Sequence, residues 1–227
     1  MRKLICIISA LSLLALLASC TKSPEEKADA MIKEKLQKSL YHPESYEPTE
    51  TKLDSAFAPF DDPVFYEKTV QMAKLGMAIT QYDEEAKSEK SSMAIWEDPY
   101  MTSLGRNEYQ EAKEKYDQAI ANKNTATEQA KVLGNELKAI MEKGKVFIGF
   151  KAKHSYRANN NNGQTIGGNM KFLFDKEMTK IVASYDMDNA EYDAVQYLYK
   201  IMRGENTMGD GMSFGLFEGS NIEEKTF

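Results

Sequence analysis

Two long stretches in the middle of the chain carry apolar residues at helical spacing, and they constrain the fold more than any other feature. The first begins at Asp62-Pro63 and continues to about Met93, and the second runs from Tyr109 to Ile140. In each stretch the apolar residues recur mainly three or four positions apart, which is typical of one face of an amphipathic helix. Asp62 suits the N-cap and Pro63 the first helical position. The sequence therefore predicts two long helices.

A short connection containing Asp98-Pro99 and Gly105 separates the two stretches. Two long amphipathic helices joined in this way fold back as an antiparallel hairpin, so we expect a hairpin over about residues 62–143. At ~1.5 Å per residue each arm would be roughly 50 Å long. The second arm presents mainly alanine in its middle, and only Lys123 interrupts its apolar stripe. The hairpin is either an arm that grips a partner or a helical layer packed on its own domain.

After Lys145 the spacing of apolar residues changes from every three or four positions, typical of a helix, to every second position, typical of a strand. Alternating residues predict strands over 146–157, 170–174 and 179–185, which form an antiparallel meander. The asparagine- and glycine-rich run 159–168 is typical of a turn, since both residue types tolerate positive φ. The sequence also indicates helices over 25–40 and 190–203 and a short strand over 49–57. The fold class expected is α+β, with a small antiparallel sheet of three to four strands, helices, and the long inserted hairpin.

The N-terminus has the pattern of a lipoprotein precursor. Arg2 and Lys3 precede an apolar run of about 14 residues, which is shorter than the roughly 20 needed to span a bilayer. The run ends in Leu17-Ala18-Ser19-Cys20, which resembles the bacterial lipobox. The resemblance implies that residues 1–19 are a signal peptide and that Cys20 is the lipid attachment site. The expected location is extracytoplasmic, with the chain anchored to the outer membrane through that lipid.

Composition limits the chemistry of the mature chain. Loss of Arg2 and Lys3 would take the formal net charge from −6 to about −8, which disfavours nucleic acid as a partner. The two cysteines are Cys6, in the signal peptide, and Cys20, so the mature chain would have no free thiol and no disulfide. We expect no cofactor and no metal. The mature chain is expected to comprise a polar tether over 20–29 and one domain over 30–227, with a loosely held tail from about 204.

The sequence contains few residues that suggest catalysis. The only histidines are His42 and His154, and a catalytic pair or metal site would require them to meet in space. Without that meeting, His154 is expected on a solvated strand face. The acidic run from Asp186 fails the calcium-loop pattern, because Glu191 stands where glycine is needed. No catalytic residues are therefore assigned. A possible ligand or partner surface is assigned to four residues near the turn: His154, Tyr156, Arg157 and Asn160.

Two segments resemble an uncharacterised group of Bacteroidetes cell-envelope lipoproteins. The first is LYHPESYEP at 40–48 followed by LDSAF at 53–57, and the second is HSYRAN at 154–159 followed by FLFD at 172–175. The turn between the last two motifs is asparagine-rich here, whereas in the group it is usually rich in glycine and aromatic residues. The resemblance covers the ends of the mature chain and not its helical middle. It implies a small α+β domain with the hairpin inserted, and it carries no known activity.

Two functional hypotheses follow from these patterns. The first is a non-enzymatic lipoprotein that binds or scaffolds another, unidentified protein of the cell envelope through the hairpin or the sheet edge. The second is a glycan-binding or hydrolytic lipoprotein with a site around His154, Tyr156 and Arg157. The missing catalytic constellation favours the first hypothesis.

Overall fold

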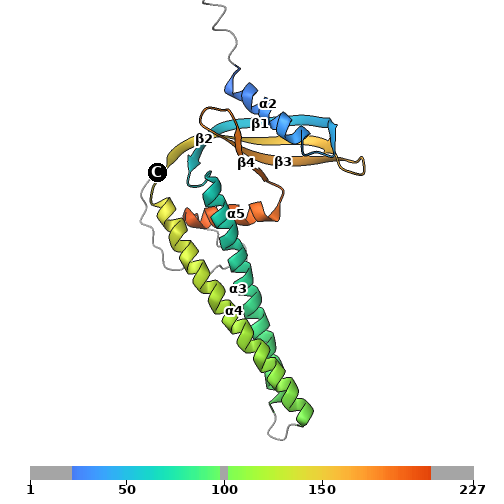
Figure 1. Cartoon of the computed structure of the whole chain (residues 1–227), viewed down its shortest axis with the longest axis vertical. Helices are drawn as coiled ribbons and strands as arrows, with labels where there is room; N and C mark the ends of the chain where they lie inside the picture. Colours follow the sequence, from blue (N-terminus) through green and yellow to red (C-terminus); the bar gives the residue numbers. More distant parts are fainter. Residues whose placement is uncertain (1–21, 98–101, 206–227) are drawn as a thin grey trace, which may run out of the picture. The chain divides into compact units, whose positions relative to one another are not determined.

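The computed structural model describes residues 22–97 and 102–205, and the fold is α+β as expected (Figure 1). The chain divides into two compact units. One unit comprises the residues up to Ala56 together with Ile148–Met187, and it contains the sheet. The other comprises Phe57–Phe147 and the residues from Asp188 onward, and it contains the helical hairpin. Cys20, the expected signal peptide and most of the expected tail lie outside the described residues.

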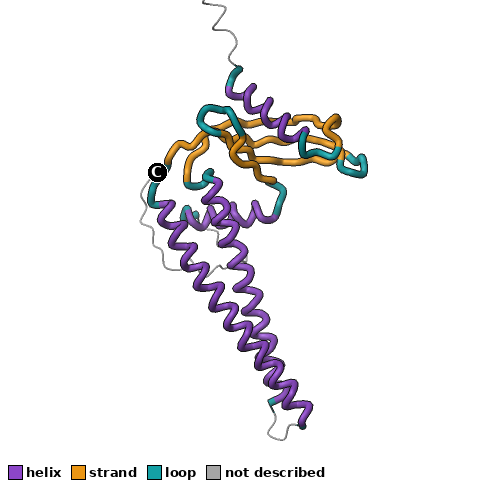
Figure 2. The backbone as a smooth tube through the Cα atoms, viewed as in Figure 1, coloured by secondary structure: helices purple, strands orange, loops and turns teal. Residues whose placement is uncertain are grey.

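The first unit is built on a four-stranded antiparallel sheet, drawn in orange in Figure 2. Its strands follow chain order. The strands are β1 (His42–Ala58), β2 (Val146–Asn159), β3 (Thr165–Phe174) and β4 (Ile181–Asp186). The expected meander of β2, β3 and β4 is confirmed, and β1 adds to it beside β2. The β2–β3 register runs from Phe150 opposite Phe174 to Asn159 opposite Thr165.

The turn between β2 and β3 forms where asparagine and glycine cluster. The side-chain oxygen of Asn160 accepts hydrogen bonds from the backbone N–H groups of Asn162 and Gln164, at 2.9 and 3.0 Å. Gly163 adopts φ of +77°, a conformation that side chains with a Cβ atom disfavour. The turn expected from this run of residues is confirmed.

Strand β1 is longer than the sequence indicates, because residues 42–48 are extended as well. Pro43 and Pro48 lie inside it, and proline is tolerated there because β1 is an edge strand of the sheet. Tyr46 and Thr51 are five positions apart, yet both contact the side chain of His154. A regular strand would place them on opposite faces, so the pleat is interrupted between them, where Pro48 lies.

Helix α2 (Pro24–Gln37) provides the other half of the sheet unit's core. Ser23 and Glu26 form a capping box at its start, and Ala28, Ile32 and Leu36 are its buried residues. These three residues pack in one cluster with the β2 and β3 residues Ala152, Phe172 and Phe174 and with Met178. The helix begins within the segment 20–29 that the sequence suggested as a tether. The reason is local: Ser23 caps the helix and Ala28 is fully buried.

The second unit consists of α3 (Pro63–Trp96), α4 (Ser103–Met141) and α5 (Ala190–Met202). Asp62 caps α3 by accepting a hydrogen bond from the Val64 N–H, as the sequence predicts. Helices α3 and α4 pack along each other as the expected hairpin, and α5 packs against α3 near one end of the hairpin (Figures 1 and 2). Among the described residues, no helix has both the length and the apolar character that membrane spanning requires.

The large apolar side chains of this unit gather at the end of the hairpin that α5 covers. The cluster there includes residues of all three helices: Phe65, Met72, Leu133, Leu137, Val195, Leu198 and Tyr199. Farther along α4 the buried residues are Ala126, Ala119, Ala112 and Gly105, spaced seven apart. Alanine permits close approach of helices but removes little apolar surface from water. The core in the far part of the hairpin therefore buries little apolar surface.

Candidate functional site

His154 is the residue most suggestive of chemistry, and the structure places it inside the sheet unit. It lies on β2 and is 2% exposed, so the expectation of a solvated strand face is wrong. Its Nε2 lies 2.9 Å from the Tyr46 hydroxyl oxygen, and its Nδ1 lies 2.9 Å from Thr51 Oγ1. The even-numbered residues of β2 face α2, and this alternation, which is visible in the sequence, predicts burial at position 154 as well.

The surroundings of His154 keep its imidazole neutral. Burial lowers the pKa of His154, and Asp29 on α2 opposes that shift only partly. Burial also raises the pKa of Tyr46 to about 12, so the phenol stays protonated. The ring of Tyr156 stacks on His154 at a centroid distance of 5.9 Å, and Phe172 meets it edge-on at 6.3 Å. A neutral imidazole between two hydroxyl groups holds β1 against β2, and its hydrogen-bond partners include no carboxylate.

The four residues assigned to a ligand or partner surface do not share one face. His154 and Tyr156 point toward the α2 side of the sheet, where Tyr156 is half-buried. Arg157 is exposed and, as the next residue on β2, points the opposite way. Asn160 is occupied in shaping the turn. The structure therefore brings the first two together and separates the other two from them.

The two histidines do not form a common site. His42 Nδ1 lies 3.1 Å from Glu44 Oε1, whereas the two ring nitrogens of His154 are occupied by Tyr46 and Thr51. Within residues 22–97 and 102–205, no group of three histidine, cysteine, aspartate or glutamate side chains could hold a metal ion. Asp193 lies in the first turn of α5, where its charge favours the helix N-terminus.

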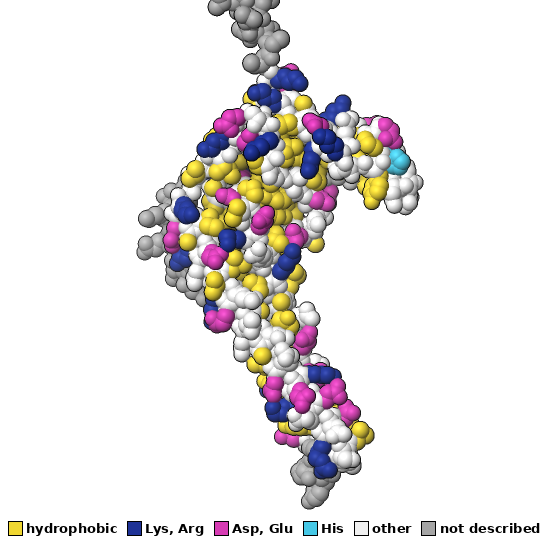
Figure 3. Space-filling model, in the orientation of Figure 1, with side chains coloured by type: hydrophobic (Ala, Val, Ile, Leu, Met, Phe, Trp, Pro, Cys, Tyr) yellow, Lys and Arg dark blue, Asp and Glu magenta, His cyan; other side chains and the backbone are white. Residues whose placement is uncertain are grey.

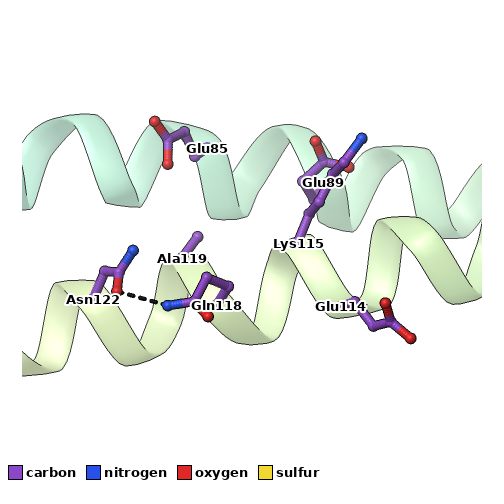
Figure 4. A pocket seen from close by; sticks show the side chains of 7 residues that line it. All are labelled: Glu85, Glu89, Glu114, Lys115, Gln118, Ala119 and Asn122. Carbon is purple, nitrogen blue, oxygen red and sulfur yellow. Dashed lines mark hydrogen bonds between the residues drawn. The ribbon is translucent and has the colours of Figure 1, made fainter.

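The hairpin carries an open groove of about 440 Å³ between its two helices (Figure 4). Figure 4 shows Glu85 and Glu89 along α3 and Ala119 between the two helices. The α4 side is lined by Glu114, Lys115, Gln118, Ala119 and Asn122. Lys115 also pairs with Glu111 at 2.7 Å. The groove is consequently acidic and amide-rich along its walls, with a small side chain at Ala119.

A charged contact joins the two helices beside this groove. Lys123 Nζ donates to Asp83 Oδ1, and Lys87 Nζ lies 2.6 Å from Asp83 Oδ2. The hydrogen bond from Lys123, followed by that from Lys87, lowers the pKa of Asp83 to about 2. The sequence showed Lys123 as an interruption of the α4 stripe and did not identify its partner. A cation in one seam calls for a carboxylate in the facing seam, but the sequence does not show which acidic residue of α3 faces Lys123.

Comparison with known proteins adds no family to these observations. No protein family model, no curated protein sequence and no solved structure matches the chain.

Proposed function

We propose that this chain is a membrane-anchored extracytoplasmic lipoprotein that binds or scaffolds another component of the cell envelope without catalysis. The signal-peptide and lipobox patterns ending at Cys20 support the anchoring, and the Bacteroidetes resemblance supports the outer membrane as its location. The α3–α4 hairpin is the proposed binding element, and its partner is a protein that remains to be identified.

The observation that supports the binding role is the uneven distribution of large apolar side chains along the hairpin. Its large apolar residues lie where α5 packs, whereas the far part is held by alanines and the Asp83–Lys123 contact. Two long helices extended beyond their own core present a long surface with an open groove, and within residues 22–97 and 102–205 no further helix or strand is found to pack along that far part. Such a surface suits a partner that lies along the helices.

The glycan-binding or hydrolytic alternative receives less support. Hydrolysis at His154 would require a base within reach of substrate, but this imidazole is buried and bonded to two hydroxyl groups. The face of β2 that bears Arg157 lies away from His154 and supplies no acid–base pair with it.

Anchoring is tested by metabolic labelling with a fatty acid and by fractionation of cells. The intact chain should incorporate label and sediment with the outer membrane, and Cys20→Ser should do neither. A labelled Cys20→Ser variant, or an unlabelled wild-type chain, would contradict the lipoprotein assignment.

Partner binding is tested with a shortened hairpin. Deleting residues 84–97 and 103–116 removes two heptads from each arm while keeping the Asp83–Lys123 contact and the core around Phe65. In-cell crosslinking followed by mass spectrometry should show one dominant partner for the intact chain and for the matched control Arg157→Ala. The shortened chain should lose it. A partner retained by the shortened chain would exclude the hairpin as the binding element.

A further inference from the structure

The far end of the hairpin exposes large apolar side chains from both of its helices. At the end of α3, Ile95 is 75% exposed and Trp96 is 37% exposed. At the start of α4, Leu104 is 62% exposed. The last turn of α3 and the first turn of α4 lie at the same end of the hairpin in Figure 1. We call these three residues, Ile95, Trp96 and Leu104, the apex.

Single exposed apolar residues are common on proteins, but the apex differs from a single residue. Its members come from two helices, the end of α3 and the start of α4. The space-filling view shows many charged side chains along the sides of the hairpin (Figure 3). The sides hold ion pairs such as Lys113 with Asp117 and Lys115 with Glu111. Large apolar side chains are thus exposed both where α3 ends and where α4 begins.

From this arrangement we propose that the apex inserts shallowly into a zwitterionic lipid bilayer. A bilayer accepts a convex apolar end without needing a complementary pocket, and binding grows with the apolar area buried. Isoleucine and leucine would contribute that area. Tryptophan suits the boundary because its ring is apolar and its N–H can remain hydrogen-bonded at headgroup level.

The charges around the apex select the kind of lipid surface. In the sequence Glu97 and Asp98 follow Trp96 directly, and Arg106 and Glu108 lie in the first two turns of α4. These four residues have a balance of two negative charges, so a strongly anionic surface would repel the apex, whereas a zwitterionic one would not. This inference goes beyond the proposed binding function and does not depend on it.

Trp96 supplies a local reporter, because it is the only tryptophan in the chain. The full chain is incorporated into vesicles of phosphatidylcholine, and Trp96 emission, iodide quenching and quenching by brominated lipid are recorded. Insertion predicts emission at shorter wavelength, loss of iodide quenching and gain of bromolipid quenching relative to the chain in lipid-free detergent. Phosphatidylglycerol vesicles should give a smaller response. Because the readout is at Trp96, attachment through the N-terminus does not produce it.

Matched variants on one helix distinguish insertion from general association. Leu104→Ser should lower the ratio of inserted to free apex about tenfold or more, since burying one leucine is worth at least that factor. Val132→Ser is the control, because Val132 is 60% exposed on the same helix but lies outside the apex. Circular dichroism verifies that both variants fold.

Three results would overturn the proposal. Trp96 emission and quenching could be unchanged by vesicles, Leu104→Ser could respond as strongly as wild type, or Val132→Ser could lose the response equally. If vesicles leave Trp96 unchanged while in-cell crosslinks still form at position 95 or 104, the apex is a protein contact. The binding function would then stand and the lipid proposal would fall.

Discussion

Lys123 on α4 donates a hydrogen bond to Asp83 on α3, and the two residues join the helices where the apolar core has already thinned to alanine. A seam of alanines only weakly fixes how far one helix is shifted along the other, because many alignments of small side chains bury a similar apolar area. A charged pair at a seam position favours one alignment, since a shift would separate Lys123 from Asp83 and leave Asp83 with only Lys87 of its own helix. We interpret this contact as the feature that fixes the register of the far half of the hairpin.

The first prediction concerns the acid dependence of this contact. The folded pKa of Asp83 is about 2, below its ordinary value of 3.8, so the carboxylate contributes stability that is present above about pH 4. That contribution should be lost as pH falls from about 4 toward 2, because the proton then binds. Asp83→Asn should therefore lower the urea midpoint near neutral pH and have a diminishing effect toward pH 2.

The control for this prediction is Asp117→Asn. Asp117 pairs with Lys113 on the exposed side of α4, at 2.6 Å, and does not join the two helices. Its loss should hardly change the urea midpoint. Equal effects of the two variants at neutral pH would refute a special role for Asp83 in the hairpin.

The sequence predicts the hairpin well because its signal is long and local. Asp62 and Pro63 define where α3 begins, and three to four residue spacing persists through both helices. The sequence does not identify which residues face one another across the hairpin. The pairing of Lys123 with Asp83 depends on how far each helix extends before and after the connection, and periodicity within one helix does not contain that information.

The His154 cluster was harder to predict for a different physical reason. Strand alternation places His154 on the same face as Ala152, but its neighbours in sequence, Tyr156 and Arg157, are residue types that often lie at surfaces. Burial of the imidazole depends on two hydroxyl groups from β1, a strand more than 100 residues earlier in the chain. Such a partnership between distant segments is visible only in the folded structure.

The second prediction is that His154 makes the stability of the sheet unit depend on pH. Burial holds its folded pKa below the ordinary value of 6.5, so the unfolded chain binds a proton more readily. Stability should therefore fall as pH drops below about 6.5 and reach its plateau above that pH. Thermal unfolding followed from about pH 5 to pH 8 measures the slope. His154→Gln should flatten it, and an unchanged slope in that variant would assign the effect to other groups.

The third prediction concerns removal of the imidazole. His154→Ala leaves a cavity and removes the two ring nitrogens to which the Tyr46 and Thr51 hydroxyl groups are hydrogen-bonded. We therefore expect a loss of about 2–4 kcal/mol in unfolding free energy. His42→Ala is the matched control, because the ring of His42 is 40% exposed and lies 3.1 Å from the exposed carboxylate of Glu44. It should change stability by less than about 0.5 kcal/mol. Similar losses in the two variants would contradict the structural role assigned to His154.

The fourth prediction ranks three glycines by the space around them. A Cβ on Gly149, whose φ is +148°, would lie 2.1 Å from the Phe174 carbonyl oxygen, so Gly149→Ala should destabilise most, by more than about 3 kcal/mol. A Cβ on Gly168 would lie 2.7 Å from Cζ of Tyr156, and displacing that ring should cost about 1–3 kcal/mol. A Cβ on Gly167 would lie 4.0 Å from the Tyr156 carbonyl oxygen, an ordinary contact, so Gly167→Ala should have little effect. Chemical denaturation of the three variants tests the order, and a large loss for Gly167→Ala would contradict it.

The fifth prediction tests whether close packing at the alanine seam holds the far part of the hairpin together. Ala119 is 3% exposed and lies between the helices, so Ala119→Leu should force them apart and cost about 1–3 kcal/mol in unfolding free energy. Ala121→Leu adds the same side chain at an exposed position of α4 and should change stability by less than about 0.5 kcal/mol. Hydrogen exchange along α4 locates the effect: Ala119→Leu should speed exchange in the far part and leave the region around Leu133 and Leu137 protected, because larger apolar side chains hold that end. If exchange accelerated equally along the whole helix, the hairpin would unfold as one cooperative unit and the alanine seam would not be its weak segment.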